Sequence, residues 1–590
     1  MKYLQKAGLG IFIAALLTFV SLLLLSKYEV TDAGLETLSG KLKDSHREIL
    51  LEELQQLKGR EFSSKFTFLG AASAVIDLTN DRVRKQYGLP EETIEQFVQT
   101  AVGGDDRNLS VSQDSYDQAI ALVKEDMRET VVAYSNWLVG QSAGNEDELK
   151  QKVRDGINGA INGYAGNFLI SDYDAQDYLF AMAKTMAKGA YWENPFVFFF
   201  FIVVIGTIGA LFWIFPAFFD GMPGIKHNGI YHSSATSRGI VGILAGAFLI
   251  GFYILLYFKH AYIAEWVSLA DPVSGLLRKG APADRWFMYG FLYTVAIIVM
   301  GIRMFTKYRH SKYHIVRTAS VMFFQIAFAF LIPQVLHNLN LPEQDLKNMW
   351  PLDYSFFFDY RLTTFSATQA GIWMMVWGII LFVIGVPVIT YFFGKRWYCS
   401  WVCGCGGLAE TLGDPYRQLS SKKLSSWQIE RYLIHGVLVF SVVMTGLVLY
   451  TYFTGQSTIL GLNSYSVRGL YGFAIGSVFA GIIGTGFYPL LGNRAWCRFG
   501  CPLAAYLGIV QRFKSRFRIT TNGGQCISCG NCSTYCEMGI DVRAYAQKGQ
   551  NIVRSSCVGC GVCAAVCPRG VLALENGTND DSSRMSEVLF

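Results

Sequence analysis

Two stretches fix the structure of the C-terminal region: Cys526-Ile-Ser-Cys529-Gly-Asn-Cys532-Ser-Thr-Tyr-Cys536 and Cys557-Val-Gly-Cys560-Gly-Val-Cys563-Ala-Ala-Val-Cys567-Pro568. Both have the spacing C-x2-C-x2-C-x3-C, with which short loops hold [4Fe-4S] clusters. Three thiolates on one loop cover three corners of a cubane, and a distant cysteine closes the fourth. The spacing therefore predicts two [4Fe-4S] clusters in a small, compact domain.

The fourth cysteine of each stretch is expected to ligate the cluster of the other stretch. One cluster would lie on Cys526, Cys529, Cys532 and Cys567, and the other on Cys557, Cys560, Cys563 and Cys536. Zinc is the alternative, but zinc sites rarely use four closely spaced cysteines twice over. Glu537 stands where a proline follows the last cysteine of the second stretch. A carboxylate there is expected to lower the potential of the nearby cluster.

Two further cysteine groups come directly after apolar segments. They read Arg396-Trp-Tyr-Cys399-Ser-Trp-Val-Cys403-Gly-Cys405 and Arg494-Ala-Trp-Cys497-Arg-Phe-Gly-Cys501-Pro502. Both follow Arg-x-aromatic-Cys-x3-Cys, 98 residues apart, which indicates an internal repeat. Positions i and i+4 share one face of a helix, so two such pairs could present four thiolates to one metal centre. Redox dithiols and free thiols in a tight turn are the alternatives, and Cys405 is a fifth candidate ligand.

Composition indicates a membrane protein, because charged residues make up 16% and hydrophobic residues 52% of 590 residues. A typical soluble domain has about 25% charged residues. Apolar runs of about 20 residues predict membrane-spanning helices. Eight are expected: Ala7–Leu25, Pro195–Phe219, Gly239–Phe258, Trp286–Phe305, Ala319–Leu336, Gly371–Phe393, Tyr432–Tyr452 and Val467–Leu491.

These features predict a mainly α, polytopic membrane protein in four parts. They are an N-terminal membrane anchor (1–26), a helical domain (27–193), a transmembrane domain with the Cys-x3-Cys motifs (194–510), and a two-cluster ferredoxin domain with its tail (511–590). A cleavable signal peptide is the alternative for the first part, but no small-x-small cleavage site follows Leu25. Domain 27–193 has no cysteine and no cofactor motif, and could be a docking platform or a ligand sensor. The segment Gln511–Ile519 alternates aromatic and basic residues, which predicts either a membrane-surface anchor or a solvated linker.

Lysine and arginine gather in the loops after the fourth, sixth and eighth spans, which the positive-inside rule assigns to the cytoplasm. The loop Lys259–Arg285 argues against this orientation, because it carries four basic residues on the opposite side. The total favours a bacterial inner membrane with a cytoplasmic ferredoxin domain and an extracytoplasmic domain 27–193. No sustained basic stripe or motif indicates binding to nucleic acid.

The cysteine pairs at helix ends, followed by the two-cluster tail, resemble the polyferredoxin membrane proteins of the NapH and NosR type. The resemblance covers about Gly371 to Leu574, and implies quinol-linked electron supply to periplasmic nitrate reductase and nitrous oxide reductase. The family's C-x3-C-P is matched fully by Cys497, Cys501 and Pro502, whereas Gly404 and Cys405 follow Cys403. The NosR type also carries a flavin on a threonine motif, which is absent between Lys27 and Glu193, so no flavin is expected there.

The leading hypothesis is an electron-transfer iron–sulfur protein that connects a quinol pool or a cytoplasmic donor with an extracytoplasmic redox partner. Quinol dehydrogenase activity is left open. Polar residues within spans are candidates for quinone contact or for interhelical hydrogen bonds; these are Gln325, Gln334, His337 and His435. A second resemblance, to the membrane ferredoxins of cytochrome oxidase assembly, implies copper handling as the alternative. A redox sensor would need an output module, and none is visible.

Overall fold

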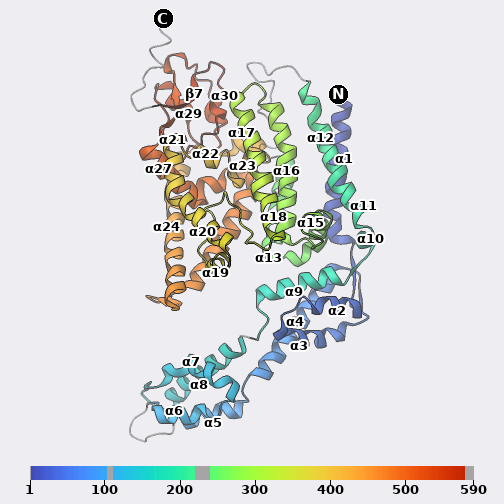
Figure 1. Ribbon diagram of the computed structural model, residues 1–590, viewed down its shortest axis with the longest axis vertical. Coiled ribbons are helices and arrows are strands. Elements are labelled where there is room, and N and C mark those ends of the chain that lie inside the picture. The colour runs from blue at the N-terminus through green and yellow to red at the C-terminus, as the bar shows by residue number, and fades with distance from the viewer. Residues whose placement is uncertain (1, 103–109, 167, 220–238, 578–590) are drawn as a thin grey trace. The chain divides into compact units, whose positions relative to one another are not determined.

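The computed structural model describes residues 2–102, 110–166, 168–219 and 239–577. They fall into two compact units. The larger unit contains the membrane helices and the C-terminal domain (Figure 1). The smaller unit consists of Ser21–Pro195 and Lys259–Glu265.

Eight helices of the described residues are long and apolar enough to cross a membrane, which confirms the eight predicted spans. Wider π-helical turns interrupt several of them, so that one span can comprise two α-helices. In chain order the spans are α1 (Lys2–Leu25), α11 (Pro195–Phe199) with α12 (Gly206–Ile214), α13 (Ile240–Phe258), α16 (Arg285–Lys307), α17 (Lys312–Phe323) with α18 (Ile332–Asn338), α20 (Gln369–Ile380) with α21 (Val386–Phe393), α24 (Leu424–Thr454), and α25 (Ser464–Tyr471) extended by Gly472–Gly486.

Small residues let α1 lie directly against α12. A Cβ added to Gly8 would lie 2.6 Å from the carbonyl oxygen of Gly209, and one added to Gly209 would lie 2.8 Å from Ile11. Such close backbone approach is the usual way in which helices associate in a bilayer, where apolar surface alone gives no driving force. The first apolar helix is thereby packed into the membrane unit.

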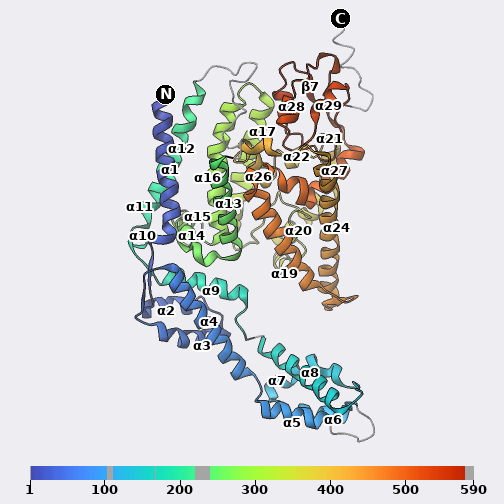
Figure 2. The ribbon, with the colours of Figure 1, turned by 180° about the vertical axis from the view of Figure 1, so that it is seen from behind.

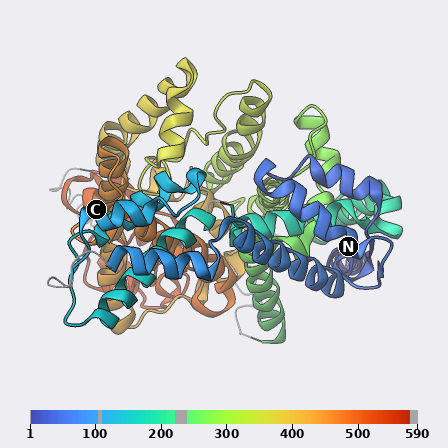
Figure 3. The ribbon, with the colours of Figure 1, turned by 90° about the horizontal axis from the view of Figure 1, so that it is seen from below.

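The smaller unit, coloured blue to cyan in Figure 3, is helical with two separate hydrophobic cores. One core contains Leu50, Phe68 and Met182, and the other contains Phe97 and Ile157. A three-stranded sheet in the order β2-β1-β3 supports the first core. The elements are β1 (Lys27–Glu29), α2 (Asp32–Ser39), α3 (Asp44–Leu54), β2 (Glu61–Phe62), α4 (Lys65–Tyr87), α5 (Glu91–Val102), α6 (Gln113–Ile120), α7 (Glu125–Ser135), α8 (Glu146–Gly166), α9 (Asp172–Thr185), β3 (Ala187–Lys188) and α10 (Ala190–Glu193).

The segment that follows the third span is part of this smaller unit. Glu265 is fully buried, accepts a hydrogen bond of 2.8 Å from the hydroxyl of Tyr28, and forms an ion pair with Lys65. His260 contacts Asp177 at 2.9 Å. Residues 259–265, which follow span three, thus pack into the domain that follows span one.

The C-terminal domain begins with a strand rather than with a surface segment. Helix α27 (Pro502–Lys514) leads into β6 (Phe517–Thr521), which pairs antiparallel with β7 (Leu572–Asn576). Phe517 and Arg518 are buried. Within the segment 511–519, residues 517–519 lie in this strand, whereas Arg512 and Phe513 are exposed at the end of α27, where the expectation of a surface anchor stays a prediction. Short helices complete the domain: α28 (Asn531–Thr534), α29 (Val542–Gln547) and α30 (Val562–Ala565) (Figure 2).

The candidate cysteine sites

Each predicted set of four cluster-binding cysteines lines one small cavity. Cys526, Cys529, Cys532 and Cys567 line the first, and Cys536, Cys557, Cys560 and Cys563 line the second. The chain thus brings the fourth cysteine of each stretch to the other stretch. All thirteen cysteines are free thiols. Four converging thiols in an apolar pocket are the donor set of a [4Fe-4S] cluster.

Glycines at matching positions make this arrangement possible. Gly530 and Gly561 precede α28 and α30 with φ values of 79° and 81°, a left-handed conformation that glycine adopts without strain. The second of these loops also contacts the membrane helices. A Cβ on Gly561 would lie 2.7 Å from the ring of Tyr313, whose hydroxyl donates a 2.8 Å hydrogen bond to the carbonyl of Gly559. The second cluster cavity is therefore held against α17.

The two Cys-x3-Cys pairs meet in a third cavity, called here the four-cysteine site. It is lined by Cys399, Cys403, Cys497 and Cys501, each 6% exposed, together with Tyr398 and Trp496. Cys405 lines the same cavity, but its side chain is exposed. Four buried thiols in one apolar pocket can hold a metal ion or a small cluster.

The pairs do not lie on one face of a regular helix, and that expectation was wrong. In each repeat the amide of the second cysteine donates to the carbonyl five residues earlier, from Cys403 to Tyr398 at 2.8 Å and from Cys501 to Trp496 at 3.0 Å. The second cysteine then caps the next helix, α23 (Gly404–Glu410) or α27. Helix N-termini favour a thiolate, and the amide of Ala504 points at Cys501 Sγ at 3.4 Å.

A glycine with a positive φ ends the span before each pair. Gly394 has a φ of 66° and Gly492 a φ of 89°, and both stand five residues before the first cysteine. This left-handed turn lets the chain leave the span and fold back toward the membrane interior. The repeat seen in the sequence is thus a repeat in backbone conformation.

The four-cysteine site lies inside the span region rather than at its edge. Gln325 donates a 2.8 Å hydrogen bond to the carbonyl of Val402, and the hydroxyl of Tyr293 donates to that of Gly404 at 2.9 Å. Gln325 follows the start of α17 at Lys312 by thirteen residues, which corresponds to about 20 Å along a helix. The contacts between α17 and the C-terminal domain, at Tyr313 and Arg317, are near its start.

A buried ionic bridge joins the four-cysteine site to the second cluster cavity. One nitrogen of Arg494 lies 3.7 Å from Cys497 Sγ and donates to the carbonyl of Cys399 at 3.1 Å. The guanidinium pairs with Glu410 at 2.6 Å and with Glu537 at 3.1 Å. Glu537 follows Cys536 directly in the chain. Arg494 thus reaches from a thiol of one site to the residue beside a thiol of the other.

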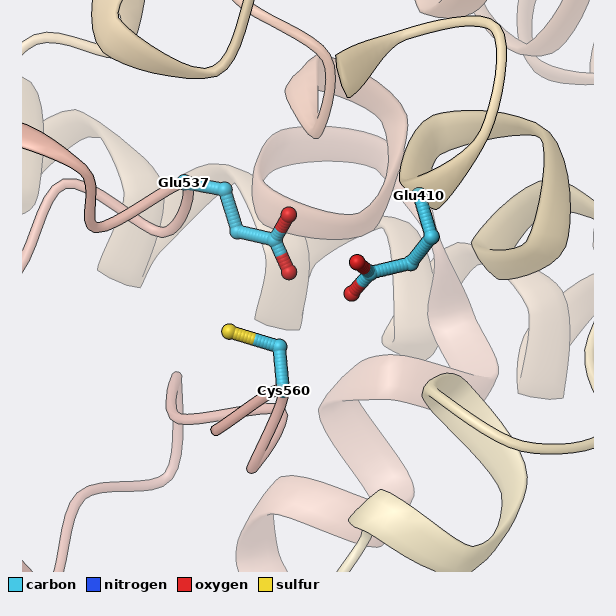
Figure 4. A group of neighbouring side chains, drawn as sticks. All are labelled: Glu410, Glu537 and Cys560. Carbon is cyan, nitrogen blue, oxygen red and sulfur yellow. The ribbon is translucent and has the colours of Figure 1, made fainter. Parts of the chain in front are cut away.

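Two more arginines complete this bridge. Arg417 pairs with Glu537 at 2.6 Å and with Glu410 at 2.9 Å, and Arg317 pairs with Glu410 at 2.9 Å. Burial opposes ionisation of Glu410, but the three guanidiniums hold the pKa of this carboxyl well below its usual range. Figure 4 shows the carboxylates of Glu410 and Glu537 facing each other beside Cys560. One oxygen of each carboxylate and the sulfur of Cys560 lie within 4.8 Å of one another.

The expected effect of Glu537 on the potential of the nearby cluster depended on an uncompensated carboxylate. Arg417 and Arg494 both pair with Glu537, so a lowered potential is no longer expected on this ground. The spacing of cysteines could not show this, because both arginines come from other parts of the chain. Arg494 stands three residues before Cys497 and Arg417 twelve residues after Cys405, and this proximity was the signal that the sequence offered.

All four polar residues considered for quinone contact have hydrogen-bond partners within the protein. Gln325 donates a hydrogen bond to the carbonyl of Val402, Gln334 accepts one from Arg278, and His337 contacts Glu343 at 2.6 Å. His435 lines a cavity of about 830 Å³, with its Nδ1 2.6 Å from the carbonyl of Arg431. Both glutamines are thus hydrogen-bonded within the protein, to residues in turns rather than in neighbouring helices.

Comparison with known families places the cysteine sites in a class. A family described as a 4Fe-4S binding domain matches residues 375–425 and again 471–520, once around each Cys-x3-Cys pair. A family described as a 4Fe-4S dicluster domain matches residues 518–568. The chain therefore combines membrane-spanning helices with 4Fe-4S ferredoxin-type domains.

Whole proteins with related segments support the same class. The chain is 28% identical over 158 residues to YccM of Escherichia coli, named for electron transport, covering 25% of this chain and 43% of that protein. It is 26% identical over 160 residues to MauN of Methylobacillus flagellatus, a ferredoxin-type protein of methylamine utilization, covering 26% and 53%. An uncharacterized protein of Methanocaldococcus jannaschii, MJ0750, is 29% identical over 167 residues, covering 27% and 66%.

The chain spans about half the length of the first two relatives. No solved structure matches it. The resemblance to ferredoxin-type electron-transport proteins of the polyferredoxin kind is confirmed for the C-terminal part of the chain.

Proposed function

We propose that this protein carries electrons between a donor at its ferredoxin domain and a redox partner on the opposite side of a bacterial inner membrane. The proposal depends on three cysteine-lined cavities, two in the ferredoxin domain and one at the four-cysteine site, which lies well inside the spans. The ionic bridge through Arg494 connects the second and third cavities. A cytoplasmic carrier alone would have no use for a thiol site at that depth.

The residues present fit the proposed iron–sulfur groups. Each cavity of the ferredoxin domain offers four thiols and apolar walls, and a bound cluster would accept and release one electron at a time. The chain's own contribution is to fix the thiols, to exclude water, and to balance charge. Between the sites, the charges of Glu410 and Glu537 are balanced by three arginines, so that neither carboxylate lacks a cationic partner.

The proposed orientation places the ferredoxin domain in the cytoplasm and residues 27–193 outside. The loops after spans four, six and eight all contact the ferredoxin domain, through Tyr313, Ser400 and Arg494 respectively. The opposing loop Lys259–Arg285 is less basic than its composition suggests, because Arg278 is buried and pairs with Asp284 at 2.6 Å. Such a pair neutralises one of its four charges.

The donor is proposed to be quinol or a cytoplasmic electron carrier, and the acceptor a protein that docks on the domain 27–193. Quinol oxidation would make the protein a quinol dehydrogenase component. The domain 27–193 shows no flavin attachment motif. Quinol added to proteoliposomes should reduce the clusters if quinol is the donor. Clusters that stay oxidised would exclude quinol and assign the donor role to a soluble cytoplasmic carrier.

Purified protein is expected to contain about eight iron atoms in the ferredoxin domain, plus any metal in the four-cysteine site. Iron analysis with electron paramagnetic resonance of the dithionite-reduced protein measures this. A protein with no reducible cubane signal, after anaerobic purification and iron–sulfur reconstitution, would contradict the proposal.

The exchange of fourth ligands gives a separate prediction. Cys536→Ser is expected to disturb the cluster of Cys557, Cys560 and Cys563, and to leave the cluster of the first stretch intact. Cys567→Ser should do the reverse. If each stretch instead kept its own fourth cysteine, Cys536→Ser would disturb the cluster of the first stretch and Cys567→Ser that of the second. The spectra of the two variants distinguish these two arrangements.

A second candidate function is the handling of copper for metallocentre assembly. The five thiols that line this one cavity favour it, because soft thiolate ligands bind copper(I). Copper bound at one equivalent and lost in the Cys405→Ser variant, with the cubane signals intact, would support this function. Copper binding independent of Cys405 would count against it.

A further inference from the structure

A cavity of about 830 Å³ lies outside the three cysteine cavities. It is formed by the first turns of α24, by α27, and by residues 538–556 of the ferredoxin domain. Cys497 lines both this cavity and the four-cysteine site, and Met538 and Ile540 line both this cavity and the second cluster cavity. The occupant would therefore border two proposed redox sites.

The cavity carries an excess of positive charge. Six basic side chains line it: Lys395, Lys422, Lys423, Arg431, Arg512 and Arg554. The two acidic residues that line it already have partners, since Glu430 accepts from Arg498 and Asp541 accepts from Ser533 at 2.6 Å. Lys395 is only 1% exposed, and no carboxylate among the described residues forms an ion pair with it. Burial lowers the pKa of Lys422 to about 8, and an anion in the cavity would stabilise its charged form.

Apolar side chains also line the cavity, and the length of α24 indicates that it lies near the level of the membrane surface. Helix α24 has 31 residues, or about 46 Å, whereas the hydrocarbon core is about 30 Å thick. Its first turns are polar and contain Trp427, 36% exposed, and Tyr432, 77% exposed, as expected for residues at the headgroup level. Ile509 and Phe513 of α27, which also line the cavity, are exposed as well.

We propose that this cavity binds an anionic phospholipid of the surrounding membrane. The phosphate lies among the lysines and arginines, and the acyl chains follow the apolar face of α24 and α27. Basic pockets at the ends of membrane helices are suited to such headgroups. The bound lipid completes the exclusion of water around Cys497, on the side where the protein leaves the four-cysteine site next to an open cavity.

The experiment compares lipids on the whole protein in nanodiscs. Native mass spectrometry should show retained phosphatidylglycerol from mixed nanodiscs, and no comparable retention of phosphatidylcholine. In the variant Lys423→Gln/Arg431→Gln, which changes two exposed cavity cations on one helix, retention should fall by roughly tenfold or more. The matched control Lys312→Gln/Lys548→Gln removes two exposed cations outside the cavity and should retain the lipid as the wild type does.

Three results would overturn the proposal. Equal retention of both lipids would exclude an anion site, and equal losses in the variant and the control would exclude this cavity. Retention of quinone instead of phospholipid would assign the cavity to quinone. Inorganic phosphate that displaces phosphatidylglycerol would assign it to a soluble phosphate ligand. Iron content and cubane spectra of the same samples report on the electron-transfer proposal separately, because the lipid contacts no predicted ligand of the ferredoxin clusters.

Discussion

The variant Cys399→Ser/Cys497→Ser should stop electron transfer across the membrane while both ferredoxin clusters remain. One thiol is removed from each repeat of the four-cysteine site, and neither residue lines a ferredoxin cavity. Loss of two of four ligands removes the centre, because hydroxyls do not replace thiolates at a soft metal site. In proteoliposomes that contain ferricyanide, external dithionite should reduce the internal ferricyanide when the wild-type protein is present. With the variant, the reduction rate should equal that of ferricyanide-containing liposomes without protein.

The matched control is Cys405→Ser, which changes a cysteine of the same cavity that lies outside the repeated pairs. It should keep transmembrane reduction, and both variants should keep the cubane signals of the ferredoxin domain. Transfer at the wild-type rate in the double variant would exclude the four-cysteine site from the electron path. If the Cys405→Ser variant also lost electron transfer, Cys405 would be assigned as a ligand of the centre in the four-cysteine site.

The variant Arg494→Met should lose about 3–5 kcal/mol of stability, the usual cost of leaving a buried charge without its partner. Arg494, Glu410 and Glu537 are each at most 3% exposed at the side chain. The substitution keeps most of the side-chain volume but removes the guanidinium between two carboxylates. Denaturant titration in detergent, followed by cluster absorbance and by helix content, measures the loss.

Arg84→Met is the control, since Arg84 and Asp81 form an exposed ion pair on α4, with side chains 59% and 61% exposed. Such pairs contribute about 0–1 kcal/mol. The double variant Glu410→Gln/Arg494→Met should be less destabilised than the sum of its single variants, because the two residues share one network. Equal stability of the Arg494 and Arg84 variants would show that the ionic bridge does not hold the two sites together.

The sequence alone was sufficient for the membrane spans and for the two sets of ferredoxin cysteines, but not for the helix geometry expected of the Cys-x3-Cys pairs. Apolar runs long enough to cross a bilayer have few alternatives to a helix, since unpaired backbone groups are costly in hydrocarbon, and all eight were found. The C-x2-C-x2-C-x3-C stretches placed Cys536 and Cys567 in the opposite cavities, because three ligands on a short loop need a distant fourth. The 98-residue repeat likewise described two turns of the same kind at Gly394 and Gly492.

Only the tertiary structure decided how these pieces contact one another. Arg317, Arg417 and Arg494 belong to three loops that composition assigned simply to a basic side of the membrane, yet all three are buried against Glu410 and Glu537. The depth of the four-cysteine site follows from hydrogen bonds of Gln325 and Tyr293 to a turn far away in the chain. Such contacts arise because buried charges and polar groups must find partners, and the partners of Gln325, Tyr293 and Arg317 are more than seventy residues away in the chain.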